Sequence, residues 1–300
     1  MNKINCPHCD SDEVKEFLST KDYFITRDPF FVYECDNCKV LFTYPVPENS
    51  VLYSKYYKSD NYLSHNKKAS DLFSRLYRAV QKINIKKKIK LLEEVNKSGE
   101  KKMLEIGAGT GDFMAACGNY GWRCFGVEPS DKARAVAIEF NKINLAPTIN
   151  EIGESGFSII TLWHVLEHIA DLGETIEKLK SLLSPNGRLI IAVPNHRSFD
   201  ARHYKQFWAG YDVPRHLYHF NKTSLSSIMK ASGFDMIKTY PMIFDSFYVS
   251  LLSEKYKHNK LIINYLYGFT IGLISNISSV LTGESSSIIF IFQKRGQGHY

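Results

Sequence analysis

The sequence lacks an uninterrupted apolar run of the length that spans a membrane, which is about 20 residues. Its nearest approach, the charge-free run 261–283, is broken by asparagine, serine and threonine. We expect a buried or amphipathic helix there, with contact to a membrane surface as the alternative. The first residues also lack an apolar stretch of signal-peptide length before a cysteine-bearing segment, so we expect a cytoplasmic, reducing compartment.

A strong excess of one charge and a biased composition are missing too. The 300 residues carry 38 basic and 31 acidic side chains, a net charge of +7, and 44% of them are hydrophobic. These ordinary values exclude disorder, collagen and coiled coil, and they suit about two domains or one large domain with an accessory module. The modest charge permits an anionic substrate or a nucleic acid without requiring either.

Cysteine is scarce except at the start of the chain, where four of the six cysteines form two Cys-x-x-Cys pairs. Cys6 pairs with Cys9, and Cys35 with Cys38. Each pair can present two thiolates to one ion, and Zn²⁺ takes four ligands tetrahedrally. We therefore predict a zinc ribbon over residues 1–48, closed by four thiolates and hence structural. Replacement of one cysteine by His8, a disulfide pair and a redox pair are the alternatives.

The pattern changes after residue 48. Residues 49–98 have helical spacing and lysines between Lys82 and Lys90, which suits a solvated connector helix or a patch for phosphate or nucleic acid. Over residues 99–300 strands and helices alternate, which indicates an α/β fold with a parallel sheet covered on both faces. The predicted strands are 103–106, 123–127, 157–162, 189–193, 236–240 and 288–293, and the predicted helices are 111–120, 132–140, 169–183 and 224–232.

A glycine-rich loop follows the first of these strands and begins a helix. Glycine lets the backbone approach a ligand closely and adopt positive φ. An acid after the next strand could accept hydrogen bonds from two ribose hydroxyls. Together these features predict a site for a nucleoside-type cofactor, whereas a glycine turn alone could serve packing. The residues assigned to the cofactor are Glu105, Gly107, Ala108, Gly109, Gly111, Glu128 and Pro129.

The segments 105–111, 162–168 and 184–188, with Glu128, resemble the motifs of class I S-adenosylmethionine-dependent methyltransferases over residues 100–240. The resemblance implies a Rossmann-like, seven-stranded sheet with helices on both faces. It also implies that the glycine loop holds the methionine portion of the cofactor and Glu128 the ribose. Trp163 and His164 follow the predicted strand 157–162, which matches the fourth strand of the family, and would face the sulfonium and the acceptor.

The order of ribbon, aromatic segment and methyltransferase fold is similar to a narrower bacterial group that commonly acts on sugars or cell-surface polysaccharide precursors. The aromatic segment is matched by Tyr53, Tyr56, Tyr57 and Tyr62. This resemblance implies methyl transfer to an oxygen or carbon of a nucleotide-linked sugar or surface-glycan precursor. The path 140–157 is short for the fold, and we expect the adenine contact at 150–152.

The run from His164 to His168 also spells His-x-x-Glu-His, a zinc-binding pattern that metalloproteases carry on a continuous helix. It follows directly on a predicted strand, so we disfavour a protease. We expect His168 to cap or pack within the turn, and His164 to face the acceptor as a candidate base.

The segment 194–221 is long and rich in histidine, arginine and aromatic residues, which predicts a substrate lid. Arg215 could clamp an anionic group, and Trp208 or Tyr211 could stack on the acceptor, with Tyr57 as a further contact. His216 is the first candidate for the base that removes the acceptor proton, and His219 is another. Any of these histidines could instead anchor the lid.

Two other functions compete with this hypothesis. One is an RNA methyltransferase that uses the ribbon and the basic helix to hold nucleic acid, and the other is a zinc-containing binding protein without catalysis. The complete glycine loop and Glu128 argue against the second. A helical insertion is predicted at 245–284, where an acceptor cap, a dimer surface and a shallow membrane contact all remain open.

Overall fold

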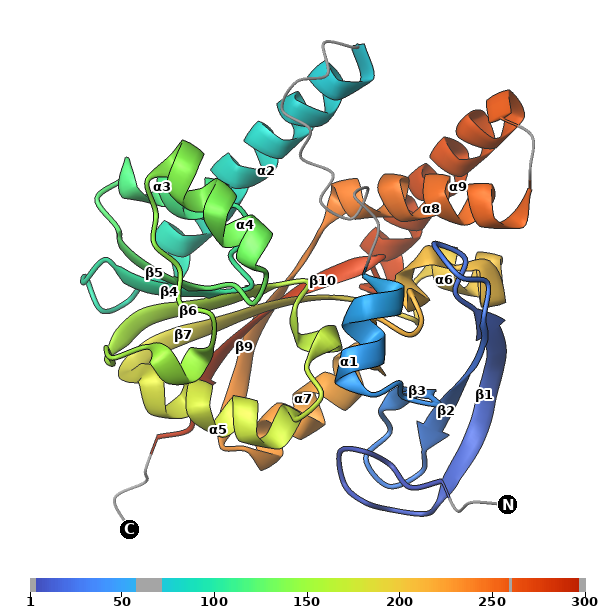
Figure 1. Cartoon of the computed structure of the whole chain (residues 1–300), viewed down its shortest axis with the longest axis horizontal. Helices are drawn as coiled ribbons and strands as arrows, with labels where there is room; N and C mark the ends of the chain where they lie inside the picture. Colours follow the sequence, from blue (N-terminus) through green and yellow to red (C-terminus); the bar gives the residue numbers. More distant parts are fainter. Residues whose placement is uncertain (1–3, 58–71, 259–260, 297–300) are drawn as a thin grey trace.

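The computed structural model describes residues 4–57, 72–258 and 261–296, which form two sheets around a shared core (Figure 1). The larger sheet has the strand order β5-β4-β6-β7-β10-β9. Its strands are β4 (Lys102–Ile106), β5 (Arg123–Val127), β6 (Phe157–Trp163), β7 (Leu183–Pro194), β9 (Phe234–Pro241) and β10 (Ser287–Lys294). β10 is antiparallel to both of its neighbours, and β5, β4, β6 and β7 pair in parallel. The described residues thus form the predicted α/β sheet with six strands.

The prediction of a seventh strand is wrong for the part of the chain that the structure describes. At the β5 edge, its place is held by a single parallel bridge between Val127 and Ala146. Between these two residues the chain passes through α4 (Asp131–Val136) and the π-helical turn η2 (Ala137–Asn141). The 3-10 turn η3 (Ile149–Glu151) follows Ala146. The short path touches the sheet edge at one residue, because it turns away instead of running along β5.

Helices cover both faces of this sheet, as expected for parallel strands that are buried on both sides. α2 (Leu72–Val95) and α3 (Asp112–Gly118) lie on one face, where Leu92 and Phe113 pack with Met103. α5 (Leu172–Leu182) and α7 (Lys222–Ala231) lie on the other (Figure 1). Every residue of β6 is buried, and five of its seven residues are apolar, as expected for a strand that is covered on both faces.

The smaller sheet joins the N-terminal segment to the rest of the molecule. Its strands are β1 (Val14–Lys21), β2 (Pro29–Cys35), β3 (Leu41–Tyr44) and β8 (Tyr218–His219), in that order and all antiparallel. β8 comes from the predicted lid and pairs with β3. After β3 the chain continues through α1 (Asn49–Val51) and the π-helical turn η1 (Leu52–Tyr56). The N-terminal module therefore completes its sheet with a strand from the methyltransferase-like part.

The prediction of a loop-like lid at 194–221 is wrong. The segment folds as α6 (Phe199–Tyr204), the 3-10 turns η5 (Lys205–Phe207) and η6 (Ala209–Tyr211), and β8. Trp208 and Tyr211 pack with Phe30, Val32 and Leu41 in a common hydrophobic cluster. Trp208 and Tyr211 are therefore buried where this segment packs against the N-terminal module.

Two long helices occupy the segment predicted as a helical insertion: α8 (Ile243–Lys257) and α9 (Leu261–Thr282). Gly268 and Gly272 let α9 approach α8 closely, because an added Cβ would lie 3.0 and 2.9 Å from backbone atoms of α8. The opposite side of α9 exposes apolar side chains, including Leu266, Val280 and Leu281, which are 72, 84 and 86% exposed. None of the helices described has the combination of length and hydropathy that crossing a membrane requires.

Candidate active site

The loop between β4 and α3 is fixed by its own backbone. The amide groups of Gly107 and Ala108 both donate to the carbonyl oxygen of Val127 on β5, at 2.8 and 2.9 Å. Gly107 and Gly109 adopt φ values of +70° and +56°, which L side chains rarely adopt. A Cβ on Gly107 would lie 2.4 Å from Val165, whereas a Cβ on Gly109 would have no heavy atom of the described residues within 4 Å, apart from its own residue and the two adjacent ones. Gly109 therefore leaves open space in front of the loop.

The structure brings the predicted acid directly to this loop. The carboxylate of Glu128 accepts hydrogen bonds from the Gly109 and Ser130 amide groups, each at 2.9 Å. Ser130 also caps α4 by accepting from Ala133. The exposed Pro129 lies between these residues, and its carbonyl accepts from Arg134. The carboxylate is thus held in place beside the open space that Gly109 leaves.

Glu105 lies at the end of β4 and is 5% exposed. Its Oε2 is buried and finds no hydrogen-bond partner among the described residues. Burial raises the pKa of Glu105 to about 8, against the opposing charge of Lys88. Lys88 enters from α2, and its ammonium lies 4.1 Å from the centre of the Trp163 ring. An unpartnered buried carboxyl oxygen next to an open loop fits a site that a polar ligand completes.

Trp163 and His164 end β6 and point to different neighbours. Trp163 packs edge-on against Phe113, and its buried indole N–H has no partner in the described part of the chain. His164 adopts φ +56°, its Nε2 lies 2.9 Å from Asp245 at the start of α8, and its Nδ1 lies 3.3 Å from Glu167. Burial disfavours the charged ring, but the two carboxylates outweigh it and raise the pKa of His164 to about 10. A ring that stays protonated at neutral pH donates hydrogen bonds, so this geometry corrects the prediction of His164 as a base.

The contacts of His164 with Asp245 and Glu167, here called the His164 clamp, predict how the stability of the protein depends on pH. Because the folded pKa of His164 is raised above its ordinary value of 6.5, its contribution is fully present below pH 6.5 and is lost as pH rises toward 10. We expect Asp245→Asn to flatten the fall in the free energy of unfolding between pH 6.5 and 10, measured by urea denaturation. The matched control is Asp235→Asn, because Asp235 pairs with Arg295 on the surface. Identical pH profiles for Asp245→Asn and the wild type would contradict the clamp.

Glu167, His168 and His216 form a compact cluster below this clamp, in which one side-chain atom of each lies within 4.8 Å of the others. The Nδ1 atoms of His168 and His216 each lie 2.9 Å from a backbone carbonyl, of Arg215 and Gly210 respectively. A carbonyl only accepts, so both Nδ1 atoms carry a proton, and in a neutral ring the lone pair is then on Nε2. Burial and the neighbouring His216 lower the pKa of His168 to about 4. Two basic nitrogens therefore lie beside a buried carboxylate.

The structure corrects the substrate-binding role of Arg215. Its side chain is fully buried, and its nitrogens donate to Asp22, Asp212 and the Tyr56 carbonyl. These contacts leave the guanidinium facing carboxylates of the protein, so it joins the N-terminal module to the segment after α6.

The other candidates from the predicted lid are also anchored. Trp208 is 2% exposed and donates its indole N–H to Asp200, and Tyr211 is 3% exposed. His219 is buried, with its Nε2 3.0 Å from the Thr43 hydroxyl. Burial, and to a smaller extent the neighbouring rings of His216 and His196, lower the pKa of His219 well below its usual value, so it stays neutral at this junction. The structure thus gives Trp208, Tyr211 and His219 buried positions with neighbours inside the protein, where the sequence predicted side chains that face the acceptor.

Tyr57 reaches the same region from the aromatic segment, and its hydroxyl lies 3.2 Å from His168 Nδ1. Tyr62 lies outside the described residues. The His-x-x-Glu-His run does not form a continuous helix, because His164 has positive φ and a 3-10 turn, η4 (Leu166–His168), follows it. This excludes the geometry that the protease pattern needs.

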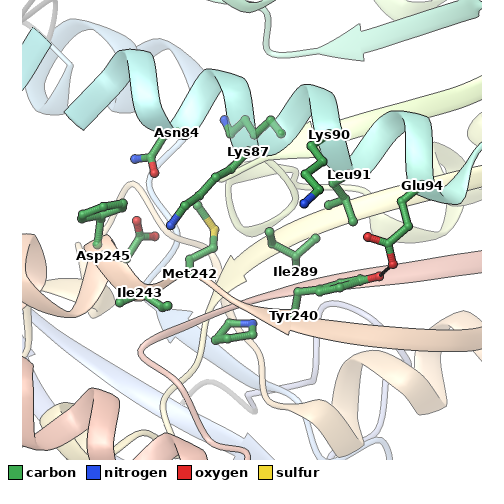
Figure 2. Close-up of a pocket in the computed structure, with 13 residues that line it drawn as sticks. Asn84, Lys87, Lys90, Leu91, Glu94, Tyr240, Met242, Ile243, Asp245 and Ile289 are labelled. Atoms are coloured by element: carbon green, nitrogen blue, oxygen red, sulfur yellow. Dashed lines mark hydrogen bonds between the residues drawn. The ribbon is translucent and has the colours of Figure 1, made fainter. Parts of the chain in front are cut away.

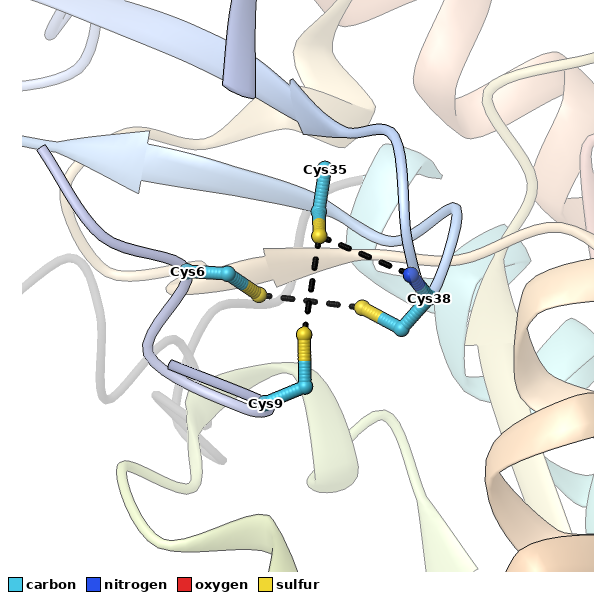
Figure 3. A group of neighbouring side chains, drawn as sticks. All are labelled: Cys6, Cys9, Cys35 and Cys38. Carbon is cyan, nitrogen blue, oxygen red and sulfur yellow. Dashed lines mark hydrogen bonds between the residues drawn. The ribbon is translucent and has the colours of Figure 1, made fainter. Parts of the chain in front are cut away.

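The four N-terminal cysteines converge (Figure 3). The Sγ atoms of Cys6 and Cys38 lie 3.6 Å apart, and so do those of Cys9 and Cys35. Four sulfurs about 2.3 Å from one Zn²⁺ in a tetrahedron lie about 3.8 Å apart. The cysteine cluster therefore has the dimensions of a four-thiolate metal site.

Two residues that contact this site, Lys88 and Asp245, were not predicted as part of it. Lys88 lies on α2, far before the glycine loop, and Asp245 opens the helical insertion. Both face Glu105 or His164 through tertiary packing alone. Lys88 lies among the apolar residues Ile85, Ile89 and Leu92 of α2, which pack on the core, and this position is the sequence signal for its burial.

A mostly parallel sheet of this strand order, with a glycine loop after β4 and an acid after β5 that meet at its carboxyl edge, defines a class I methyltransferase fold. Residues 74–239 match the family model described as a methyltransferase domain. This match covers more than half of the chain, which therefore belongs to that family and is an S-adenosylmethionine-dependent methyltransferase.

Curated relatives agree with this class. A ubiquinone biosynthesis O-methyltransferase of Bradyrhizobium diazoefficiens is 29% identical over 111 residues, 35% of this chain and 44% of the relative. Its counterpart in Azorhizobium caulinodans is 26% identical over 167 residues, 48% of this chain and 62% of the relative. The chain thus spans about half the length of the curated relatives it matches.

A solved structure shows the same fold. Magnesium protoporphyrin IX methyltransferase from Synechocystis PCC 6803, with bound S-adenosylhomocysteine, superimposes with a TM-score of 0.53 at 13% identity. The match covers 83% of this chain and 100% of that one. At this identity the likeness concerns the fold alone.

Proposed function

We propose that this enzyme transfers a methyl group from S-adenosylmethionine to an oxygen of a small acceptor. The observation that carries the proposal is the direct contact between the Glu128 carboxylate and the glycine loop, beside open space. The names of the curated relatives, which are O-methyltransferases, support an oxygen nucleophile over carbon.

Three features fit the cofactor. Glu128 offers carboxylate oxygens to the ribose hydroxyls, Gly109 leaves room for the methionine portion, and Glu105 has a buried oxygen without a partner. When bound, S-adenosylmethionine supplies an electrophilic methyl group on sulfur. The protein has to align the acceptor with that methyl group and exclude water.

An oxygen acceptor must also lose a proton. His216 remains our candidate base, because its Nδ1 proton is held by the Gly210 carbonyl and its Nε2 lone pair is available. His164 supports the site as a fixed positive charge instead.

We further propose that the cysteine cluster holds one structural zinc ion. The support is the spacing of the four sulfurs and the burial of Cys6 and Cys35 in the shared core. A closed set of four thiolates leaves no open coordination position for chemistry.

For the acceptor, we retain the class predicted from the domain order: a nucleotide-linked sugar or a surface-glycan precursor, methylated in the cytoplasm. The curated relatives carry names that refer to ubiquinone biosynthesis, so a panel of acceptors must contain phenols as well as nucleotide sugars.

The cofactor assignment is tested by calorimetric titration with S-adenosylhomocysteine. We expect one-to-one, micromolar binding for the wild type and affinity at least about tenfold weaker for Glu128→Ala, because hydrogen bonds to a charged group contribute about 1.5–3 kcal/mol. Glu139→Ala is the matched control, since Glu139 is an exposed acid on η2. Unchanged affinity in Glu128→Ala would refute the ribose assignment.

A further inference from the structure

A cavity of about 270 Å³ lies between α2 and the segment that joins β9 to α8 (Figure 2). Because β9 is parallel to β7, its end lies at the same edge of the sheet as the glycine loop. The lining of the cavity comes from α2 between Asn84 and Glu94, from the segment 240–245 and from Ile289 on β10. None of these residues except Lys88 and Asp245 takes part in the site described above.

Three lysines and two acids line the cavity, and both acids already have hydrogen-bond partners within the protein. Lys87 and Lys90 extend from α2 toward the cavity in Figure 2, and the Lys87 ammonium lies 4.8 Å from the Phe244 ring. The acids already accept hydrogen bonds within the protein: Glu94 from the Tyr240 hydroxyl at 2.6 Å, and Asp245 beside His164 at 2.9 Å. The wall formed by α2 is therefore electropositive.

The remaining lining is mostly apolar. Leu91 and Ile289 are buried and belong to the core under α2, and Met242 packs against the same core. Pro241, Ile243 and Phe244 complete the wall opposite α2. A hydrophobic floor beneath a pair of ammonium groups suits a molecule with an apolar body and a negative charge.

The inner end of the cavity meets the methyl-transfer site. Asp245 lines the cavity and contacts His164 at the end of β6. Lys88 also lines the cavity, and its ammonium group lies over the Trp163 ring. The nearby carboxyl group of Glu105 opposes the lowering of the Lys88 pKa by burial. A molecule in the cavity would thus reach the edge of the sheet where the cofactor residues gather.

We infer that this cavity binds the acceptor, and that the acceptor is an amphipathic organic anion in place of the nucleotide-linked sugar that the domain order favours. Its ring or chain lies on Leu91, Met242 and Ile289, and its carboxylate, sulfonate or phosphate faces Lys87 and Lys90. The assignment of the cavity to the acceptor depends on the proposed function, whereas its preference for apolar anions can be measured separately.

Two fluorescent probes separate charge from shape: 8-anilinonaphthalene-1-sulfonate and N-phenyl-1-naphthylamine, which has the same ring systems without the sulfonate. We expect Lys87→Met/Lys90→Met to weaken binding of the sulfonate at least about tenfold, since a single hydrogen bond to a charged group contributes about this much. Binding of the neutral probe should change by less than about twofold. The matched control is Lys82→Met/Lys86→Met, which removes two exposed charges from the same helix outside the cavity.

Equal sulfonate binding in both double variants and the wild type would overturn the inference and place the probe elsewhere, such as the exposed face of α9. Equal weakening in both would also overturn it, because overall charge would then explain the effect. Asn84→Trp, at the cavity wall on α2, should weaken both probes if they bind here.

S-Adenosylhomocysteine titration of the same proteins distinguishes the two proposals. We expect its affinity to be unchanged in Lys87→Met/Lys90→Met. A wild type that fails to bind it refutes the proposed function, while the comparison of the two probes still decides the anion preference.

Discussion

We expect Cys38→Ser to lose the zinc ion and to lower the melting temperature by about 10 °C or more. Structural zinc contributes about 10–16 kcal/mol in small zinc modules, and 1 kcal/mol corresponds to about 2–4 °C for a domain of 150–250 residues. Elemental analysis of the purified protein should give one zinc per chain, and differential scanning calorimetry should show the shift.

The effect should extend beyond the N-terminal module. β3 pairs with β8, and the Thr43 hydroxyl donates to the His216 carbonyl at 2.7 Å. Loss of the ribbon therefore exposes the segment that carries the candidate base. Cys124→Ser is the matched control, because Cys124 lies outside the cluster, on β5. A zinc-free wild type, or a Cys38→Ser protein with wild-type stability, would show that the cluster is not a structural metal site.

The second large effect is expected for Arg215→Met, which should lower the free energy of unfolding by about 3–5 kcal/mol. The side chains of Arg215 and Asp22 are both fully buried and lie 2.9 Å apart. Removing the cation leaves the carboxylates of Asp22 and Asp212 without their counter-charge in the interior. Urea denaturation monitored by tryptophan fluorescence measures the loss.

Arg202→Met provides the comparison, because Arg202 is exposed on α6, and we expect its effect to stay below about 0.5 kcal/mol. A substrate-binding arginine would behave differently: its replacement would raise KM and leave stability intact. That outcome would support the predicted binding of an anionic acceptor group by Arg215 and contradict its structural role.

Local patterns predicted the larger sheet well. β5 spans the predicted residues 123–127, and β4 and β6 differ from their predictions by a single residue. Buried parallel strands have continuous apolar runs bounded by glycine or polar turns, so their limits are visible in a short window. The contact of Glu128 with Gly109 has the same origin, because the ends of adjacent parallel strands meet at one edge of the sheet.

The parts that failed depend on contacts between distant segments. The aromatic, histidine-rich segment after β7 has the composition of a binding loop, yet its side chains fill the space between two sheets. Nothing in a single segment states that Asp22 will neutralise Arg215, or that Asp245 will hold His164 protonated. Arginine, histidine and aromatic side chains can bind a ligand, and they can also form buried polar contacts between segments of the protein. Which of the two roles they take depends on the residues that pack against them.

The pairing of β3 with β8 has a consequence for synthesis on the ribosome. Thr43 and His219, which meet at this joint, are separated by 176 residues. At about 5–20 residues per second, β8 emerges about 10–35 s after β3. During that interval the ribbon is complete in its cysteines but has an open strand edge, which is a template for wrong pairing. Early capture of zinc would then hold β2 and β3 in register while the nascent chain supplies their last partner.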